Sequence, residues 1–281
     1  MQTFITIILT IIIAPIIGGL LSGLDRVITA RMQNRVGPPI IQPFYDFFKL
    51  MGKENIIVTR NQMFYVIANL VLMITSLVLF VLKQDLLMII FIMAFGSISL
   101  ILGAMSVQSP YSRIGAQREI LQMMAYEPVL IFMAVGIFMQ TGSFTVNNIL
   151  NLNRPLLYSM PLIFIAFLFI LTIKLRKSPF DFSTSHHGHQ ELIKGMLTEF
   201  AGPQLALIEM AHWYELVLIM GFIMLFWTVN IYIAIGIAFI SYVLEMLIDN
   251  ISARMTWKWM IWFAWGLGIS LCAVNLALLY R

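Results

Sequence analysis

The stretch EFAGPQLALIEMAHWYELVLIMGFIMLFWT, residues 199–228, decides the fold because it is an apolar run long enough to cross a lipid bilayer. Glu199 lies near its start, and Glu209, His212 and Glu215 follow at intervals of three residues. At about 100° per residue, the last three side chains sweep about 120° of a helix surface. Because a charged group inside a bilayer costs a few kcal/mol, we expect this polar face to point toward protein or water.

The composition of the whole chain supports a membrane fold. Of its 281 residues 60% are hydrophobic and 11% are charged, whereas about a quarter of the residues in a soluble domain are charged. An ordinary soluble globular protein is therefore excluded. We predict an all-α polytopic membrane protein in which residues 1–281 form a single integral membrane domain. About eight transmembrane helices are expected, approximately at 3–24, 62–83, 86–107, 125–141, 157–175, 199–228, 231–248 and 259–280.

The basic residues are distributed unevenly between the connections. Fourteen of the seventeen fall in or beside the connections after the first, third, fifth and seventh spans, and only Lys83, Arg154 and Arg281 fall elsewhere. Since Lys and Arg collect in cytoplasmic loops, the long connections are predicted to be cytoplasmic and both termini to lie outside a cell inner membrane. The same rule accounts for the formal charge of +4 without nucleic-acid binding. The first span lacks a basic leader and a cleavage site, so we expect it to be retained.

The first long connection contains an amphipathic segment, PFYDFFKLM, at residues 43–51. Apolar side chains recur in it at helical spacing, and Asp46 faces elsewhere. We predict a short helix that begins at Pro43 and lies on the membrane surface or against a neighbouring subunit. Before it, a basic segment with Arg31 and Arg35 turns at Gly37-Pro38-Pro39. Its charges serve either docking or orientation in the membrane.

Other ionisable residues lie at the ends of predicted spans. Glu127 precedes Pro128 at the start of the fourth span, where it is either an interfacial residue at a helix end or an ionisable group entering the membrane. Arg113 and Arg118 lie in the short connection before it.

Glu245 and Asp249 lie one turn apart at the end of the seventh span. They either cap the helix and pair with Arg254 or belong to an ion path. Gly202-Pro203 predicts a kink near the start of the sixth span.

A histidine-rich segment, SPFDFSTSHHGHQE at residues 178–191, connects the fifth and sixth spans. Three histidines in four positions could bind a metal, but adjacent side chains such as His186 and His187 point apart on most backbones and no thiolate is nearby. A docking surface is favoured. The single cysteine, Cys272, allows neither an iron–sulfur cluster nor a thiolate zinc site, so we expect no cofactor in this chain.

Several segments together resemble the membrane component that joins the hydrophilic and membrane arms of respiratory complex I, known as ND1 in mitochondria and present in bacteria as its counterpart. The resembling pieces keep the same order as in that family. They are Ala30–Pro38, Gln42-Pro43 with Asp46, Lys49-Leu50, Lys53-Glu54, Tyr126-Glu127, Pro179-Phe180-Asp181 and Thr198–Gly202.

Two features depart from the complex I pattern. Relatives of complex I carry an acidic segment shortly after Pro-Phe-Asp, where this chain has STSHHGHQ at residues 183–190, and His212 replaces an expected glutamate. The combination PFDFSTSHHGHQE with IEMAHWYE is similar to the corresponding component of membrane-bound group 4 [NiFe] hydrogenases, the energy-converting hydrogenase and formate hydrogenlyase group. Sulfane reductases are close relatives of that group.

The resemblance implies a role as a subunit of an oxidoreductase complex. In such a complex, ferredoxin or another low-potential donor supplies electrons through [4Fe–4S] clusters to a NiFe centre that reduces protons to H₂, coupled to H⁺ or Na⁺ transport. The implied partners are the hydrogenase large and small subunits, other subunits of the hydrophilic arm and an antiporter-like membrane subunit. By this resemblance the chain anchors the hydrophilic arm, begins the ion path and has no catalytic residue of its own.

The residues themselves lead to a matching physical hypothesis. Glu127, Glu199, Glu209, His212 and Glu215 are expected to form a hydrated titratable chain, because burial and neighbouring like charges bring carboxyl groups into a range where they exchange protons near neutral pH. Residues of the cytoplasmic connections are expected to dock partner subunits or couple to them. They are Arg31, Arg35, Asp46, Arg113, Arg118, Asp181, His186, His187, His189 and Glu191.

Two other functions stay open. One is the quinone-chamber subunit of a complex I-type NADH:quinone oxidoreductase, which the shared basic connection favours and the missing acidic segment disfavours. The other is an independent secondary transporter, against which the lack of an inverted repeat argues.

Overall fold

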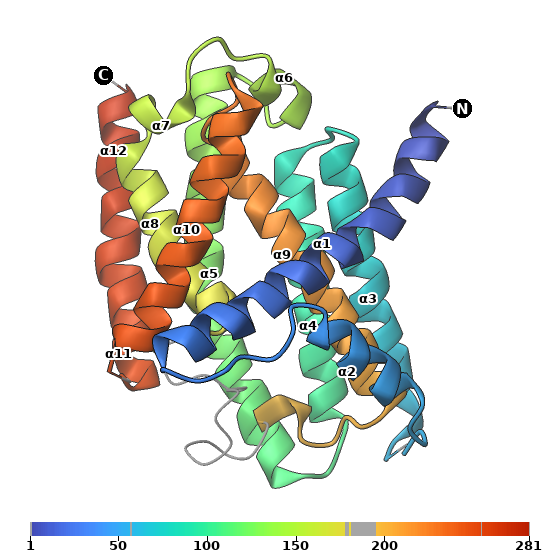
Figure 1. The fold of residues 1–281 in the computed structure, drawn as a ribbon. Helices are drawn as coiled ribbons and strands as arrows, with labels where there is room; N and C mark the ends of the chain where they lie inside the picture. Colours follow the sequence, from blue (N-terminus) through green and yellow to red (C-terminus); the bar gives the residue numbers. More distant parts are fainter. Residues whose placement is uncertain (1, 57, 178–179, 181–194, 254, 281) are drawn as a thin grey trace. The chain divides into compact units, whose positions relative to one another are not determined.

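The computed structural model describes residues 2–56, 58–177, 180, 195–253 and 255–280. Within that part every named element is a helix, as Figure 1 shows. The elements are α1 (Gln2–Met32), α2 (Gln42–Met51), α3 (Arg60–Val81), α4 (Leu86–Met105), α5 (Pro110–Thr141), α6 (Val146–Leu150), α7 (Leu156–Ser159), α8 (Pro161–Lys174), η1 (Gly195–Leu197), α9 (Pro203–Leu225), α10 (Ile231–Ile251), α11 (Trp257–Trp262), η2 (Phe263–Ile269) and α12 (Ser270–Tyr280).

Seven helical segments of the described chain are long and apolar enough to cross a membrane, which confirms an all-α polytopic membrane protein. They are α1, α3, α4, α5, α9, α10 and the continuous run from Trp257 to Tyr280. Helix α1 exposes large apolar side chains along its length, among them Phe4, Ile8 and Ile12. Such a surface suits contact with lipid chains.

The fifth predicted span, 157–175, does not reach the same length. It is divided into α7 and the 14-residue helix α8, which rises about 21 Å, less than the roughly 30 Å thickness of the hydrocarbon core. The division occurs because Pro161 has no N–H to continue a helix from α7, and Met160 has the non-helical angles φ −127° and ψ 49°.

Three helix ends differ from the sequence-based expectation. Helix α1 runs to Met32, so Arg31 lies in its last turn and not in a connecting segment. Helix α5 begins at Pro110, which places Glu127 and Pro128 inside a 32-residue helix and excludes a helix end there. Hydropathy marks where a helix crosses lipid, whereas the helix itself continues for as long as its backbone hydrogen bonds are made.

The start of α9 is also different, because Gly202-Pro203 begins the helix and does not kink it. Gly202 has φ +55°, a left-handed conformation that glycine adopts without steric cost, and a Cβ there would lie 2.7 Å from the carbonyl oxygen of Glu54. Pro203 then occupies the first position of the helix, where a missing N–H costs nothing. Glu199 therefore lies in the turn before α9.

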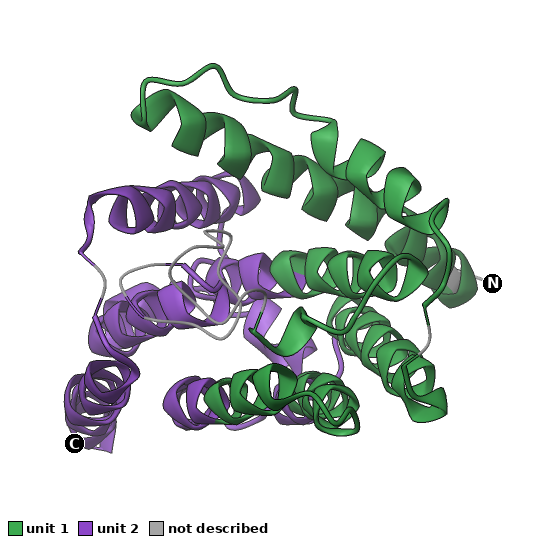
Figure 2. Cartoon of the chain, turned by 90° about the horizontal axis from the view of Figure 1, so that it is seen from below, with its two compact units in different colours: residues 1–82, 92–120, 182–217 green, residues 83–91, 121–181, 218–281 purple. Residues whose placement is uncertain are grey.

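The chain forms two compact units, coloured separately in Figure 2. Unit 1 comprises residues 1–82, 92–120 and 182–217. Within it, α1 packs against α2 and α3. It also meets α9 at backbone distance, because a Cβ on Gly18 would lie 2.5 Å from the carbonyl oxygen of Trp213. The Tyr214 hydroxyl donates a 2.7 Å hydrogen bond to the carbonyl oxygen of Ile11.

Unit 2 comprises residues 83–91, 121–181 and 218–281. Here α8 packs against α10, η2 and α12. The buried amide of Asn275 on α12 compensates for the break before α8: its oxygen accepts hydrogen bonds from the N–H groups of Leu162 and Ile163, and its nitrogen donates to the carbonyl oxygen of Ser159. One side chain thus satisfies first-turn donors that have no partner within the helix.

A second compensation in unit 2 concerns α5. Pro128 has no N–H to donate to the carbonyl oxygen of Met124, its partner four residues earlier in a regular helix. Trp265, on the π-helix η2, donates to that oxygen from its indole nitrogen at 2.9 Å. The free carbonyl of α5 is therefore satisfied by the C-terminal helical run.

Candidate functional site

Helix α2 forms as predicted, with Pro43 in its first turn and aromatic side chains along one face. That face packs on the chain's own α9: the rings of Phe44 and Phe47 lie 5.2 Å and 5.8 Å from the ring of Trp213 between centroids. Phe48 and Met51 are 69% and 44% exposed. The apolar stripe is therefore divided between packing in unit 1 and an outer surface.

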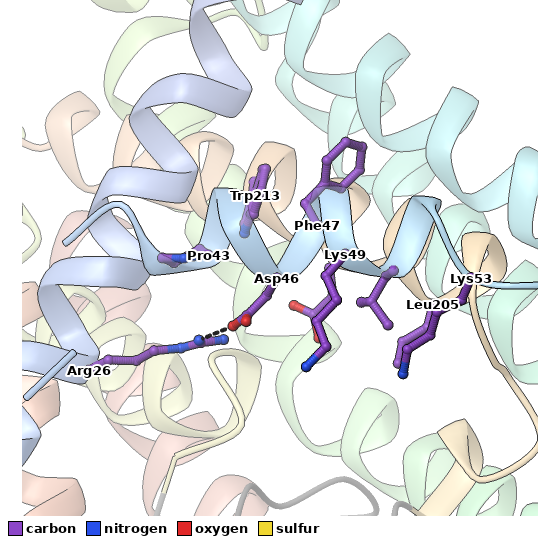
Figure 3. A pocket seen from close by; sticks show the side chains of 10 residues that line it. Arg26, Pro43, Asp46, Phe47, Lys49, Lys53, Leu205 and Trp213 are labelled. Carbon is purple, nitrogen blue, oxygen red and sulfur yellow. Dashed lines mark hydrogen bonds and ion pairs between the residues drawn. The ribbon is translucent and has the colours of Figure 1, made fainter. Parts of the chain in front are cut away.

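An ion pair fixes α2 to α1 within unit 1. The guanidinium of Arg26 lies 2.6 Å from the carboxylate of Asp46, the contact marked by a dashed line in Figure 3, and Gln42 donates to the same carboxylate at 3.1 Å. Partial burial acts to raise the pKa of Asp46. The hydrogen bonds from Arg26 and Gln42, with the charges of Arg26 and Lys49, outweigh burial and bring the pKa below its usual value.

A pocket of about 250 Å³ lies beside this ion pair. Three basic and two acidic side chains line it together with apolar and aromatic ones, several of which are labelled in Figure 3. The lining residues are Arg26, Pro43, Asp46, Phe47, Lys49, Leu50, Lys53, Leu205, Glu209 and Trp213. The structure thus brings predicted site residues Asp46 and Glu209 to one cavity, with an excess of one positive charge.

The basic side chains of this pocket were not predicted to surround Glu209. Arg26, Lys49 and Lys53 follow from the sequence only as positive charge in a connection. The fold of α2 back onto α9 brings them to the carboxylate. The resemblance of Lys49-Leu50 and Lys53-Glu54 to complex I was the one signal in the sequence that marked them.

The other two titratable residues of α9 form a pair. His212 Nδ1 lies 3.4 Å from a carboxylate oxygen of Glu215, and their side chains are 29% and 10% exposed. The interaction is an ion pair when the imidazole is protonated. Helix α9 therefore carries a carboxyl group in the pocket and a His–Glu pair along the same apolar helix.

Glu199 lies in a turn that is tied to neighbouring segments. Its carbonyl oxygen accepts a 3.1 Å hydrogen bond from the fully buried Gln62 of α3. One residue into α9, Gln204 donates to the Asn55 side chain at 3.3 Å. Both contacts lie in unit 1 and hold the turn close to the end of the α2 connection.

The predicted docking residues differ in their exposure. Arg31, Arg35 and Arg113 are exposed, and Arg113 donates to the carbonyl oxygen of Val107 at 3.3 Å. Arg118 is half-buried. The remaining predicted docking residues lie outside the described part of the chain: Asp181, His186, His187, His189 and Glu191.

The other predicted path residues belong to unit 2. Glu127 on α5 is half-buried, and one of its carboxylate oxygens is buried without a hydrogen-bond partner among the described residues. Glu245 on α10 is fully buried, and neither of its carboxylate oxygens has a partner in that part of the chain. Asp249 is half-buried one turn further on, and Arg254 lies outside the described residues.

Two lysines near these carboxylates were not singled out from the sequence. Glu127 interacts electrostatically with Lys174, and Glu245 interacts with Lys177 and Asp249. Both lysines occur among basic residues at the end of a span, where the positive-inside rule already accounts for them. Hydropathy gives no signal that their side chains turn back into the protein.

Over the described ranges, no group of three or more His, Cys, Asp or Glu side chains is arranged to bind a metal ion. What the arrangement provides instead is proton-exchanging groups in apolar helices: a pocket carboxyl, a His–Glu pair and two carboxyls beside lysines. Groups of this kind are costly in a membrane protein and usually serve an aqueous or proton path.

Comparison with known proteins gives consistent relatives. The chain is 27% identical over 205 residues to hydrogenase-4 component C of Escherichia coli (strain K12), an alignment that covers 68% of this chain and 64% of that protein. It is 27% identical over 255 residues to a membrane component of the NADH-quinone oxidoreductase of Solibacter usitatus (strain Ellin6076), covering 80% of this chain and 64% of the relative. Formate hydrogenlyase subunit 4 of Escherichia coli (strain K12) is 26% identical over 199 residues, covering 65% of this chain and 64% of the relative. The chain thus spans just under two thirds of each relative's length.

The fold is that of a known membrane complex component. A chain from the structure of the membrane-bound sulfane sulfur reductase, an archaeal respiratory membrane complex, superposes with a TM-score of 0.88 at 24% identity, covering 99% of this chain and all of that one. The family described as NADH dehydrogenase matches residues 4–280. The resemblance to the ND1-type component of complex I and to hydrogenase membrane subunits is confirmed, and the chain belongs to the NADH dehydrogenase family.

Proposed function

We propose that this chain is the membrane-anchoring and ion-translocation coupling subunit of an energy-converting [NiFe] hydrogenase-type complex, linking H₂ evolution to H⁺ or Na⁺ transport. One observation carries the proposal. Helix α9 places Glu209 in a charged pocket beside α2 and pairs His212 with Glu215, all within one apolar helix. This arrangement joins a surface helix to titratable groups in a membrane span.

In this role the chain's own residues bind, position and hold protons. The pocket between α1, α2 and α9 can transmit a change in charge at the surface to Glu209, because Arg26, Lys49 and Lys53 line the same cavity. The imidazole of His212 can hold or release a proton next to Glu215. Electron transfer belongs to partner subunits: ferredoxin as donor, iron–sulfur proteins and the NiFe subunit are the proposed partners, together with an antiporter-like membrane subunit.

The first experiment asks what the chain assembles with. An affinity-tagged chain purified in mild detergent is expected to bring a nickel–iron polypeptide with it, and the membranes are expected to evolve H₂ from a low-potential donor. A preparation without nickel, or one whose H₂ evolution is unaffected when the chain is deleted, would contradict the proposal.

The second experiment tests the ion path itself. Glu209→Gln and Glu215→Gln keep the side-chain shape but remove the proton-exchanging group, so each should lower ion pumping at least tenfold while the complex still assembles. The matched control is Glu54→Gln, because Glu54 is exposed near α2. Normal pumping in both test variants would rule out these residues as path members.

A quinone-linked role is the second candidate, favoured by the aromatic wall that Phe47 and Trp213 give to the pocket and by the likeness to a component of a quinone oxidoreductase. In that case the purified complex should reduce a short-chain quinone, and the activity should fall on Trp213→Ala. A sulfane-linked role, suggested by the shared fold, would instead show as reduction of a polysulfide by the same preparation.

A further inference from the structure

Two lysines at the C-terminal end of α8 are almost completely buried. Lys174 is 7% exposed and Lys177 is 6% exposed. An ammonium group removed from water is unfavourable unless other groups compensate its charge. Orientation in the membrane does not explain these positions, since that effect needs only charge in the connecting segment and not a buried side chain.

The backbone turn that carries both lysines is well defined. The N–H of Arg176 donates to the carbonyl oxygen of Ile173 at 3.1 Å, and the N–H of Lys177 donates to that of Thr172 at 2.9 Å. With Arg176 at φ +55°, these two bonds form a Schellman motif that ends α8. A non-glycine residue in this conformation costs about 1 kcal/mol, so the turn is maintained by other contacts.

Lys174 lies against Tyr126 and Glu127 of α5. Its ammonium group donates a 3.1 Å hydrogen bond to the Tyr126 hydroxyl and lies 4.3 Å from the centre of that ring. The carboxylate of Glu127, the next residue in the chain, interacts electrostatically with the same ammonium group.

Lys177 repeats this arrangement on α10. Its ammonium group lies 5.0 Å from the ring centre of Tyr242, which is almost fully buried. Glu245 follows Tyr242 by one helical turn, is fully buried, and has no hydrogen-bond partner for either carboxylate oxygen among the described residues. The charged groups that act on Glu245 are Lys177 and Asp249.

We propose that Lys174 and Lys177 are positioning residues of the ion path, Lys174 acting as the counter-charge of Glu127 and Lys177 as that of Glu245. One helix end then controls the charge of carboxyl groups on two different helices. The two tyrosines support this role, because a cation over an aromatic face is stabilised without being neutralised. The inference rests on the proposed ion-translocating function, to which it adds two residues.

The test uses the purified complex with Lys174→Met or Lys177→Met. The protonation of buried carboxyl groups is followed as a function of pH by the infrared C=O stretching band, assigned with Glu127→Gln and Glu245→Gln. Loss of a neighbouring positive charge favours the protonated carboxyl group, so each band should titrate at least about one pH unit higher in the matching methionine variant. Lys174→Arg and Lys177→Arg keep the charge and should restore most of the shift.

Lys258→Met is the matched control, since Lys258 also lies over an aromatic ring, that of Trp257 at 5.7 Å, but is exposed. A methionine variant that shifts its band no more than Lys258→Met does would overturn the inference. If a single variant does not assemble, the pairs Lys174→Met with Glu127→Gln and Lys177→Met with Glu245→Gln apply. Each removes both charges and should restore assembly, whereas assembly defects that add in the double variant would contradict the pairing.

The infrared readout does not depend on transport. A wild-type complex that pumps no ions would remove the proposed function, yet the band shifts would still test the lysines. A pumping complex without band shifts would remove the lysine inference alone.

Discussion

Individual carboxyl groups in this protein differ by the cation that faces each one. Asp46 has Arg26 at 2.6 Å in a partly exposed ion pair, whereas Glu245 is fully buried and has Lys177 as its nearest basic influence. An exposed pair contributes little to stability because water and salt screen it. A buried carboxyl depends much more on its partner, because the medium screens the charge less.

The Asp46 pair leads to a prediction about acid pH. Because the pKa of Asp46 is lowered from about 3.8 in the folded state, the pair stabilises the fold above that value, and its contribution is lost as the pH falls through the lower folded pKa. Asp46→Asn should therefore lower the free energy of unfolding by about 1 kcal/mol or less at pH 7. In thermal unfolding of the detergent-solubilised protein, the difference from wild type should disappear near pH 3. A difference that grows in acid would contradict this assignment.

At the scale of helices, α1 and α9 approach so closely that no side chain fits between them at Gly18. Gly18→Ala would place its Cβ 2.5 Å from the carbonyl oxygen of Trp213, a backbone atom that cannot rotate away. We expect the free energy of unfolding to fall by about 1–3 kcal/mol. The packing of Phe44 on Trp213 should loosen as well, which tryptophan fluorescence can follow.

Gly236→Ala is the control for that prediction, since Gly236 lies in α10 and nothing lies within 4 Å of the place that an added Cβ would occupy. It should be neutral or stabilising by about 0.5–1 kcal/mol, because alanine favours a helix over glycine. Equal effects of the two substitutions would mean that helix propensity, and not the approach of α1 to α9, decides the result.

Elements with a strong local signal could be predicted from the sequence, and those that depend on tertiary contacts could not. Helix α2 follows from the spacing of its aromatic residues and from Pro43, and it is observed at Gln42–Met51. The continuation of α5 upstream of Glu127 is hidden because its first turns are polar. The short α8 has a visible cause in Pro161, which the hydropathy of the span outweighed in the prediction.

The candidate site shows the same division. The spacing of Glu209, His212 and Glu215 marked α9, but it did not separate a pocket carboxyl from a His–Glu pair, because that depends on which helix packs beside each side chain. Lys174 and Lys177 could not be found, since their burial is set by Tyr126 and Tyr242 on other helices.

For the molecule as a whole, orientation in the membrane stays a prediction, and the chain offers a direct way to measure it. Its single cysteine, Cys272, is buried, so an introduced cysteine can be labelled with little background. Val36 and Tyr232 are 91% and 82% exposed, in the first connection and at the start of α10. The charge bias predicts that Val36→Cys reacts with a membrane-impermeant maleimide from the cytoplasmic side only, and Tyr232→Cys from the opposite side only. Reversed labelling would invert the orientation.

The hydrogen bond from Trp265 to the carbonyl oxygen of Met124 has a consequence for the history of the sequence. Any residue other than proline at position 128 would supply its own N–H to that oxygen, and the indole donor would then be redundant. Pro128 and Trp265 are 137 residues apart in the chain but answer one requirement, so descendants of a common ancestor are expected to lose or retain them together.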